Sequence, residues 1–355
     1  MDLTIFKTPY SLTNKNNNLK KKNESVNRSN NEHVSSPDSM EIIMEDVLAL
    51  LNIDVSYNER ISQINNILHQ QGNNYTELNL TVVSSSLNYD QNTYIITPSG
   101  LKNSKRNGND GIVLFGYERK NNIKRETDNL NTDNNIYSNE NGNNNNINND
   151  LDIIDDFLLN DFVFPIEENE ENNGLYEFPN FAIYYNINDG NYYIKDFNTG
   201  VGALMKIKKY KMEKNTLINI GSNYLVVYID KNIITIKIFN NNTILNNNKD
   251  NNKNLGQNCV MKEFQIKNNN NTIITIGRSQ KCDIIIEDMM LSKIQAYIQY
   301  NAKDDCFYLY DGDGEKESTN GTWVFILNPI QITDNFLFKA EHTLFMATLT
   351  NNNYK

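Results

Sequence analysis

The sequence predicts an all-β protein with two similar β-sandwiches, preceded by a short N-terminal helical segment. From Leu78 to Leu349, β-branched and aromatic residues recur in short runs with a period of two, which is the spacing of strands that bury one face. The order of these runs occurs twice, as expected for a chain with two copies of one sandwich. Asparagine-rich tracts separate the runs, and we expect these low-complexity insertions to be disordered because they bury little apolar surface.

The composition limits the functions that fit. The chain has 355 residues, enough for two or three domains, and a net charge of -11. This acidic balance argues against general binding to nucleic acid or to an anionic membrane, because both require positive potential. The three cysteines lie far apart and only three histidines occur, which fits neither a disulfide framework nor a metal site. We therefore predict an intracellular protein of the cytoplasm or nucleus, without metal or cofactor.

The N-terminal part divides into a tail and a helical segment. Residues 1–38 are polar and are predicted to be a disordered tail. Residues 39–72 carry apolar residues at steps of three and four, which predicts a short helical pair. Ser36 and Pro37 are typical of a helix start, and Gly72 of a helix stop. We expect the apolar face of the pair to pack on its own chain.

The two series of strand-like runs define two modules. We place the first at 92–240, with the Asn-rich tract at about 120–150 as one of its loops, and the second at 255–350. Residues 241–254 are an Asn/Lys-rich linker. The matching runs are 110–116 with 272–277, 161–164 with 283–286, 191–196 with 306–311, and 216–227 with 335–346.

Three short motifs lie along the strands of the second module: Gly277-Arg278, Ser292-Lys293 and the run 318–322, which reads Ser-Thr-Asn-Gly-Thr. Their order and spacing resemble a forkhead-associated (FHA) domain. FHA domains are β-sandwiches that hold phosphothreonine peptides on loops at one end. The resemblance implies that the second module recognises phosphorylated protein segments.

The resemblance also implies roles for individual residues. Five residues are expected to bind the phosphopeptide: Arg278, Ser292, Lys293, Thr319 and Asn320. Four more are expected to shape the site: Gly277, Gln295, Gly321 and Thr322. A guanidinium, an ammonium and a hydroxyl on three loops would suit a dianionic phosphate, which offers three strong acceptor oxygens. Gly321 is expected to allow a tight turn with positive φ, so that Asn320 can point at a bound strand.

Two departures from the family pattern bear on the site. Gln295 lies where the family usually has a histidine that braces two loops, and we expect the loop to persist in a somewhat loosened form. The loop before Ser318 is acidic, with carboxylates at Asp311, Asp313, Glu315 and Glu317. These charges would weaken phosphate binding or select peptides with basic flanks, because they lie within a Debye length of about 8 to 10 Å.

The first module lacks the phosphate-binding groups. The repeat places Tyr117, Glu177, Phe178 and Val201 opposite Arg278, Ser292, Lys293 and Asn320. A glutamate and apolar side chains cannot hold a dianion. We therefore interpret this module as a degenerate FHA-like copy with a structural or protein-binding role.

The sequence thus predicts a non-catalytic signalling adaptor that binds phosphothreonine peptides through its C-terminal FHA domain. The expected partner is a phosphothreonine-containing protein, and neither nucleic acid, membrane nor a small-molecule substrate is expected. No motif of a kinase, hydrolase or metalloprotease occurs in the chain. The alternative is a phosphate-independent protein-interaction scaffold built from the two FHA-like sandwiches.

Overall fold

The computed structural model describes residues 39–72, 74–86, 89, 92–104, 106, 108–117, 160–164, 179–199, 202–230, 233–240, 259–265 and 272–351. Within these residues the chain forms two α-helices and 21 β-strands in three open sheets. The protein is therefore mainly β, as predicted. The predicted tail at 1–38, the linker at 241–254 and the Asn-rich loop at about 120–150 lie outside the described residues.

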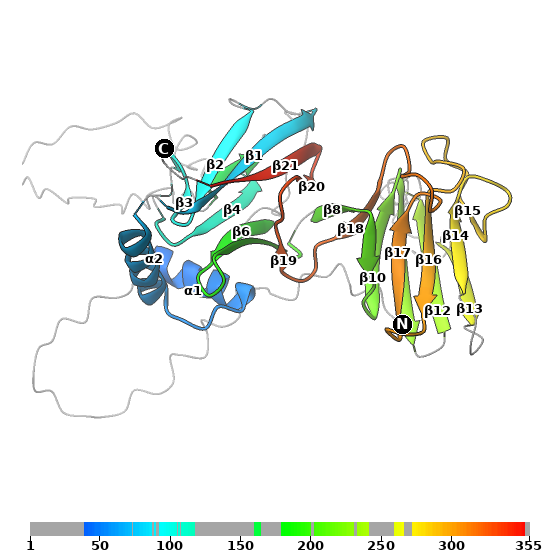
Figure 1. The fold of residues 1–355 in the computed structure, drawn as a ribbon, viewed down its shortest axis with the longest axis horizontal. Coiled ribbons are helices and arrows are strands. Elements are labelled where there is room, and N and C mark those ends of the chain that lie inside the picture. The colour runs from blue at the N-terminus through cyan, green and yellow to red at the C-terminus, as the bar shows by residue number, and fades with distance from the viewer. Residues whose placement is uncertain are drawn as a thin grey trace, which may run out of the picture.

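The largest sheet has eleven strands. In spatial order they are β13 (Cys259–Gln265), β12 (Ile233–Asn240), β11 (Asn223–Asp230), β10 (Asn215–Ile220), β18 (Thr322–Phe325), β8 (Ala203–Ile207), β20 (Phe336–Ala340), β21 (Thr343–Asn351), β1 (Thr76–Ser85), β2 (Thr93–Thr97) and β3 (Gly100–Leu101). Figure 1 shows two units along the longest axis of the molecule, with β8 and β18 between them.

Each unit has a second sheet of five strands. In the N-terminal unit these are β19 (Ile330–Gln331), β7 (Asn191–Asp196), β6 (Phe181–Asn186), β4 (Ile112–Tyr117) and β5 (Phe162–Phe164), which lie beside β8, β20, β21, β1, β2 and β3 (Figure 1). In the C-terminal unit they are β15 (Ile284–Ile285), β14 (Ile273–Gly277), β16 (Ala296–Asn301), β17 (Cys306–Asp311) and β9 (Lys209–Lys211), which lie beside β10 to β13 and β18.

The two units share strand order and register. The parallel pair β4 and β5 places Gly116 opposite Val163, and the pair β14 and β15 places Gly277 opposite Ile285. The next strands pair antiparallel in both units, β4 with β6 and β14 with β16. These registers agree with the sequence repeat, in which Gly116 corresponds to Gly277.

The chain crosses between the units twice. After β8 it leaves the N-terminal unit, and the next strands, β9, β10 and β11, complete the C-terminal unit. After β18 it returns, and β19, β20 and β21 complete the N-terminal unit. The crossing strands β8 and β18 pair antiparallel, with Met205 opposite Val324. On the two sides of this pair, equivalent strands follow in the same order. The units are therefore related by a pseudo-two-fold axis, as in an isologous dimer.

The predicted modules do not coincide with these units. The hairpin β10–β11 lies in the predicted module 92–240 but completes the C-terminal unit, and β20–β21 does the reverse. Alternation predicts which residues form strands, but two hairpins with the same alternation carry no information about their partners. The hairpins also align one residue further along than predicted, since Ile220 and Ala340 both precede the turn.

Aromatic packing fills the N-terminal core. The rings of Phe115 and Phe181 stack with centroids 4.4 Å apart. Phe181 contacts Phe338 of β20 edge-on at 6.0 Å, and Phe338 stacks on Phe345 of β21 at 5.0 Å. The equivalent hairpin positions in the C-terminal unit are the buried aliphatic residues Ile218 and Leu225. The exchanged β20–β21 hairpin therefore contributes two aromatic rings to a phenylalanine-rich core.

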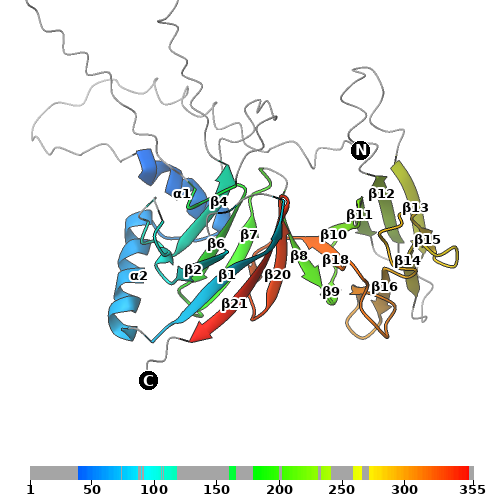
Figure 2. The ribbon, with the colours of Figure 1, turned by 90° about the horizontal axis from the view of Figure 1, so that it is seen from above.

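The first of two helices covers the outer face of the N-terminal five-stranded sheet, and the second packs against the core between the sheets (Figure 2). α1 (Ser39–Leu51) and α2 (Tyr57–Gln71) lie within the segment predicted to be helical. Met44 and Leu48 of α1 are buried in a cluster with Leu114 of β4. Arg60 of α2 is buried and donates to the carbonyl oxygen of Asp110 at 2.7 Å. The helical pair thus packs on its own chain, as expected, and no described helix is long and apolar enough to span a membrane.

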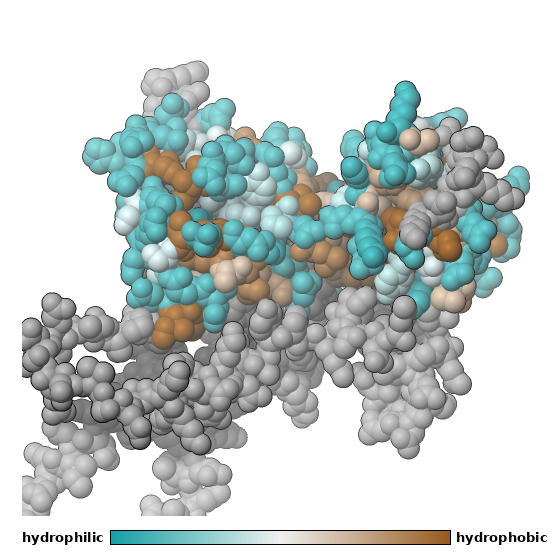
Figure 3. Space-filling view, turned by 90° about the horizontal axis from the view of Figure 1, so that it is seen from below, coloured by the Kyte–Doolittle hydropathy of each residue, from teal (hydrophilic) through white to brown (hydrophobic). Residues whose placement is uncertain are grey.

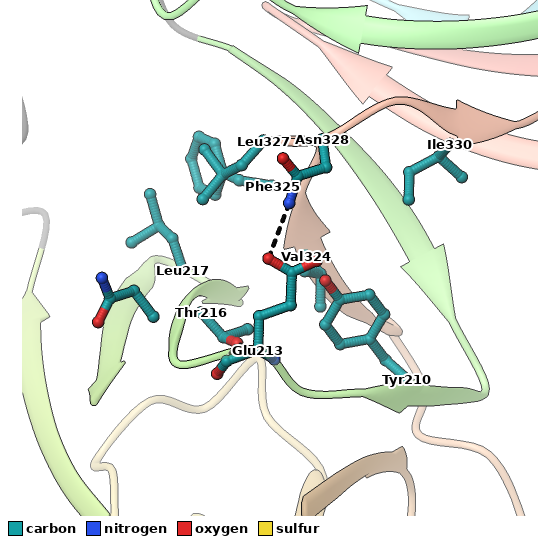
Figure 4. Close-up of a pocket in the computed structure, with 10 residues that line it drawn as sticks. Tyr210, Glu213, Thr216, Leu217, Val324, Phe325, Leu327, Asn328 and Ile330 are labelled. Atoms are coloured by element: carbon teal, nitrogen blue, oxygen red, sulfur yellow. Dashed lines mark hydrogen bonds between the residues drawn. The ribbon is translucent and has the colours of Figure 1, made fainter. Parts of the chain in front are cut away.

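The two crossing segments contact each other at a small hollow (Figure 4). Tyr210 and Glu213 line it from the first crossing, and Asn328 from the second. Asn328 Nδ2 donates to Glu213 Oε2 at 2.7 Å. The hollow encloses about 10 Å³, which is room for a single water and far below the size of a ligand pocket.

Candidate functional site

The five residues predicted to bind phosphopeptide lie on three loops of the C-terminal unit. Arg278 follows β14, Ser292 and Lys293 lie between β15 and β16, and Thr319 and Asn320 precede β18. All of these elements belong to the second repeat. The loops meet at the segment 290–292.

Two hydrogen bonds connect the outer loops to this segment. Arg278 Nε donates to the carbonyl oxygen of Leu291 at 2.7 Å. Asn320 Nδ2 donates to the carbonyl oxygen of Met290 at 2.7 Å. The guanidinium and the carboxamide are thus held at neighbouring peptide groups while both residues remain exposed to solvent.

Ser292 contacts the third loop directly. The backbone nitrogen of Thr319 donates to Ser292 Oγ at 3.1 Å, and the two hydroxyl oxygens are 3.3 Å apart. Lys293 is exposed, and its carbonyl oxygen accepts from the backbone nitrogen of Ser279 at 3.1 Å. Cations and hydroxyl donors from three loops therefore face solvent around one segment, an arrangement suited to a dianionic ligand.

Glycine is required at two positions of the site. A methyl group at Gly277 would lie 2.3 Å from the carbonyl oxygen of Lys293, so a side chain would separate the first two loops. Gly321 has a φ of +75°, which confirms the positive φ predicted for this turn. The turn is fixed further by Trp323, whose Nε1 donates to the carbonyl oxygen of Asn320 at 3.1 Å.

Gln295 joins two of the three loops, the one that contains Ser292 and the one that precedes β18. Its side chain is fully buried, and Oε1 accepts from the backbone nitrogen of Ser292 at 3.0 Å. Nε2 donates to Ser318 Oγ at 2.6 Å and to the carbonyl oxygen of Gly321 at 3.0 Å. The loops are therefore braced by a side-chain amide, and the loosening expected from the sequence is wrong.

Three of the four loop carboxylates have partners within the protein, and that of Asp313 accepts from the backbone nitrogens of Glu315 and Lys316, each at 3.0 Å. Asp311 is buried, and Oδ1 accepts from Ser318 Oγ at 2.6 Å and from the buried Thr322 Oγ1 at 2.7 Å. Glu317 pairs with Lys208 at 2.8 Å and with Lys206 at 3.7 Å. The hydrogen bond from Lys208 lowers the pKa of Glu317 below its usual range. The acidic loop therefore opposes phosphate binding less than its composition suggests.

One comparison with known proteins finds a matching family. Residues 274–339 match the family model of the FHA domain. This segment is an FHA domain. Searches of curated proteins and of solved structures each find no match. The matched segment runs from β14 to β20, so the exchange places its last strand in the N-terminal unit.

The N-terminal unit differs from the FHA domain at the site. Tyr117 takes the place of Arg278, and its ring packs against that of Phe164 with the centroids 5.7 Å apart. Glu177, Phe178 and Val201, predicted to face the other site positions, lie outside the described residues.

The loop anchor of the N-terminal unit is Asp196, equivalent to Asp311. It accepts from the backbone nitrogens of Asn198 and Ala203, each at 2.7 Å. Burial nevertheless raises the pKa of Asp196 to about 7. Within the described ranges no group of three side chains could hold a metal ion.

Sequence reasoning missed four residues near the FHA site: Lys206, Ser222, Asn223 and Asp288. The first three belong to the first repeat. Ser222 and Asn223 reach the site on the exchanged β10–β11 hairpin, and Lys206 reaches it through the pairing of β8 with β18. No sequence spacing indicates this proximity, since Ser222 and Asp288 are 66 residues apart.

Proposed function

We propose that this protein is a non-catalytic adaptor of the cytoplasm or nucleus whose FHA domain binds a phosphothreonine peptide of a partner protein. FHA domains are phosphopeptide-binding modules, and binding to phosphorylated segments through cationic clusters is their mode of recognition. The observation that carries the proposal is that Arg278, Thr319 and Asn320 all donate hydrogen bonds to one segment, 290–292, which contains Ser292. In our proposal Arg278, Ser292 and Lys293 contact the phosphate, and Asn320 holds the peptide backbone.

The proposal is tested by binding of the full chain to a degenerate phosphothreonine peptide library, with unphosphorylated and phosphoserine libraries as controls. Selective retention of the phosphothreonine library is the expected result. Arg278→Ala should weaken binding by about 1.5 to 3 kcal/mol, the typical contribution of a hydrogen bond to a charged group. Lys281→Ala, at an exposed position of the same loop, should bind like the parent. Equal affinity of Arg278→Ala and the parent would remove the basis for the assignment.

A second candidate function is a phosphate-independent scaffold. Tyr117 favours this role for the N-terminal unit, because a half-buried phenol ring replaces the guanidinium there. Pull-downs from lysate with and without phosphatase treatment separate the two functions. Partners of a scaffold survive the treatment, whereas partners of the FHA site are lost.

A further inference from the structure

The segment 290–292, which accepts hydrogen bonds from the side chains of Arg278 and Asn320, is itself in contact with the first repeat. The turn between β10 and β11 belongs to the first repeat and packs on the loop 287–291. A methyl group at Gly221 would lie 2.7 Å from Asp288 Oδ2 and 2.9 Å from Leu291 Cδ2. The two chain segments are therefore in close contact, and only glycine fits at this point of the turn.

Asp288 makes the polar part of this contact. Its Oδ2 accepts from the backbone nitrogen of Ser222 at 3.2 Å, from Ser222 Oγ at 3.0 Å and from Asn223 Nδ2 at 3.0 Å. Its Oδ1 accepts from the backbone nitrogen of Met290 at 2.9 Å. One carboxylate thus joins the turn of the first repeat to the segment 290–292.

The contact extends to two residues that are predicted to bind the phosphopeptide. Next to Asp288 in the loop, the carbonyl oxygen of Met290 accepts from the side-chain amide of Asn320, and that of Leu291 accepts from the guanidinium of Arg278. Displacement of the turn would therefore disturb the hydrogen bonds that hold the side chains of Arg278 and Asn320. A single hydrogen-bonded chain connects the two repeats through the recognition loop.

The second recognition loop also rests on the first repeat. Lys206 of β8 runs beneath Gly321, where a methyl group would lie 2.7 Å from Lys206 Cε. Its ammonium lies 3.7 Å from Glu317, which Lys208 also contacts. Residues of the first repeat thus support the loops on both sides of Ser292.

We propose that the first repeat is part of the FHA site, with Asp288 as the positioning residue that couples the β10–β11 turn to Arg278 and Asn320. This inference rests on the proposed phosphopeptide function. It gives a role in binding to the repeat that lacks the phosphate-binding residues. The exchanged β10–β11 hairpin of that repeat keeps the loop 287–293 in its binding conformation. Movement of that hairpin would change the affinity of the site without any contact to the peptide.

The test uses the full chain and a fluorescein-labelled degenerate phosphothreonine peptide pool. Asp288→Ala should weaken binding about tenfold and should speed hydrogen exchange of residues 287–293. Ser222→Asp should do the same, because it places a second carboxylate against Asp288. His342→Asp is the matched control, since His342 holds the equivalent exposed position in the β20–β21 turn, and it should change neither reading.

The double variant separates positioning from a general loss of stability. If Ser222 acts through Asp288, Ser222→Asp should add little in the Asp288→Ala background, where no carboxylate remains to repel it. Equal harm in both backgrounds, or unchanged exchange of 287–293 in Asp288→Ala, would overturn the inference. A parent chain that binds no phosphopeptide would contradict the proposed function alone, because the exchange measurement still decides whether the turn holds the loop.

Discussion

Gln295 replaces the usual histidine of the family with an amide that makes three hydrogen bonds. The carboxamide carries both an acceptor and two donors, so it can bond a backbone nitrogen on one loop and two oxygens on the other. The sequence predicted that Gln295 shapes the site. It did not predict how completely the amide is used, because that depends on the approach of two loops 26 residues apart.

We predict that Gln295→Ala lowers the free energy of unfolding by about 2 to 4 kcal/mol, since it leaves buried polar groups without partners and opens a cavity. Phosphothreonine binding should fall as well, because Ser292 loses the bond to its backbone nitrogen. Urea unfolding and peptide titration of the full chain provide the two measurements. The control is Gln331→Ala, at an exposed position of β19, which should leave both unchanged. Normal affinity in Gln295→Ala would show that the brace is dispensable for binding.

Among the elements, the strands around the pseudo-two-fold axis bring together residues of both repeats. Lys339 of β20 donates to Asn219 Oδ1 of β10 at 2.6 Å, and its ammonium lies 4.7 Å from the ring centroid of Trp323 on β18. Burial lowers the pKa of Lys339 from 10.5 to about 8. The charge is therefore retained at neutral pH at a cost in folding free energy.

This cost predicts a pH dependence with a definite sign. Between pH 8 and 10.5 the unfolded chain binds the Lys339 proton that the folded chain has released, so this residue makes stability rise with pH. Relative to Lys339→Met, the parent should gain roughly 1 to 3 kcal/mol over this window. Urea unfolding of both proteins at pH 7, 8, 9 and 10 checks it. A constant difference would show that Lys339 titrates at its ordinary pKa in the folded protein.

The hairpins also indicate why strands are exchanged. Phe338 and Phe345 of β20–β21 pack among the phenylalanines of the N-terminal unit, whereas β10–β11 offers Ile218 and Leu225 to a unit with a mainly aliphatic core. Reversing the exchange would place two phenylalanines in the space of two smaller residues. Overpacking of this kind costs about 1 to 3 kcal/mol for each position. Side-chain volume can thus select the partner that strand alternation leaves open.

At the scale of the whole molecule, the sequence predicted the strand content and the helical pair, because each depends on local spacing, whereas the roles of the FHA site residues stay a prediction. The sequence failed on connectivity. Period-two alternation and turn residues are the same for a hairpin that folds back on its own module and for one that crosses to the other. The sequence also did not predict the contact between Ser222 of the first repeat and Asp288 beside the FHA site, for the same reason.

Engineered disulfides can distinguish the two connectivities. In the exchanged fold, Thr348 of β21 lies opposite Asn79 of β1. If each repeat closed on itself, β21 would lie beside β12 instead, where Thr235 is the position equivalent to Asn79. Residues opposite each other in antiparallel strands have Cα atoms about 4.5 to 5.5 Å apart, within the range that a disulfide can bridge. We predict that Asn79→Cys with Thr348→Cys forms a disulfide under mild oxidation, and that Thr235→Cys with Thr348→Cys does not. Peptide mapping by mass spectrometry identifies the bridge and distinguishes it from bonds to the natural cysteines. Efficient bridging of positions 235 and 348 would show that each repeat closes on itself in solution.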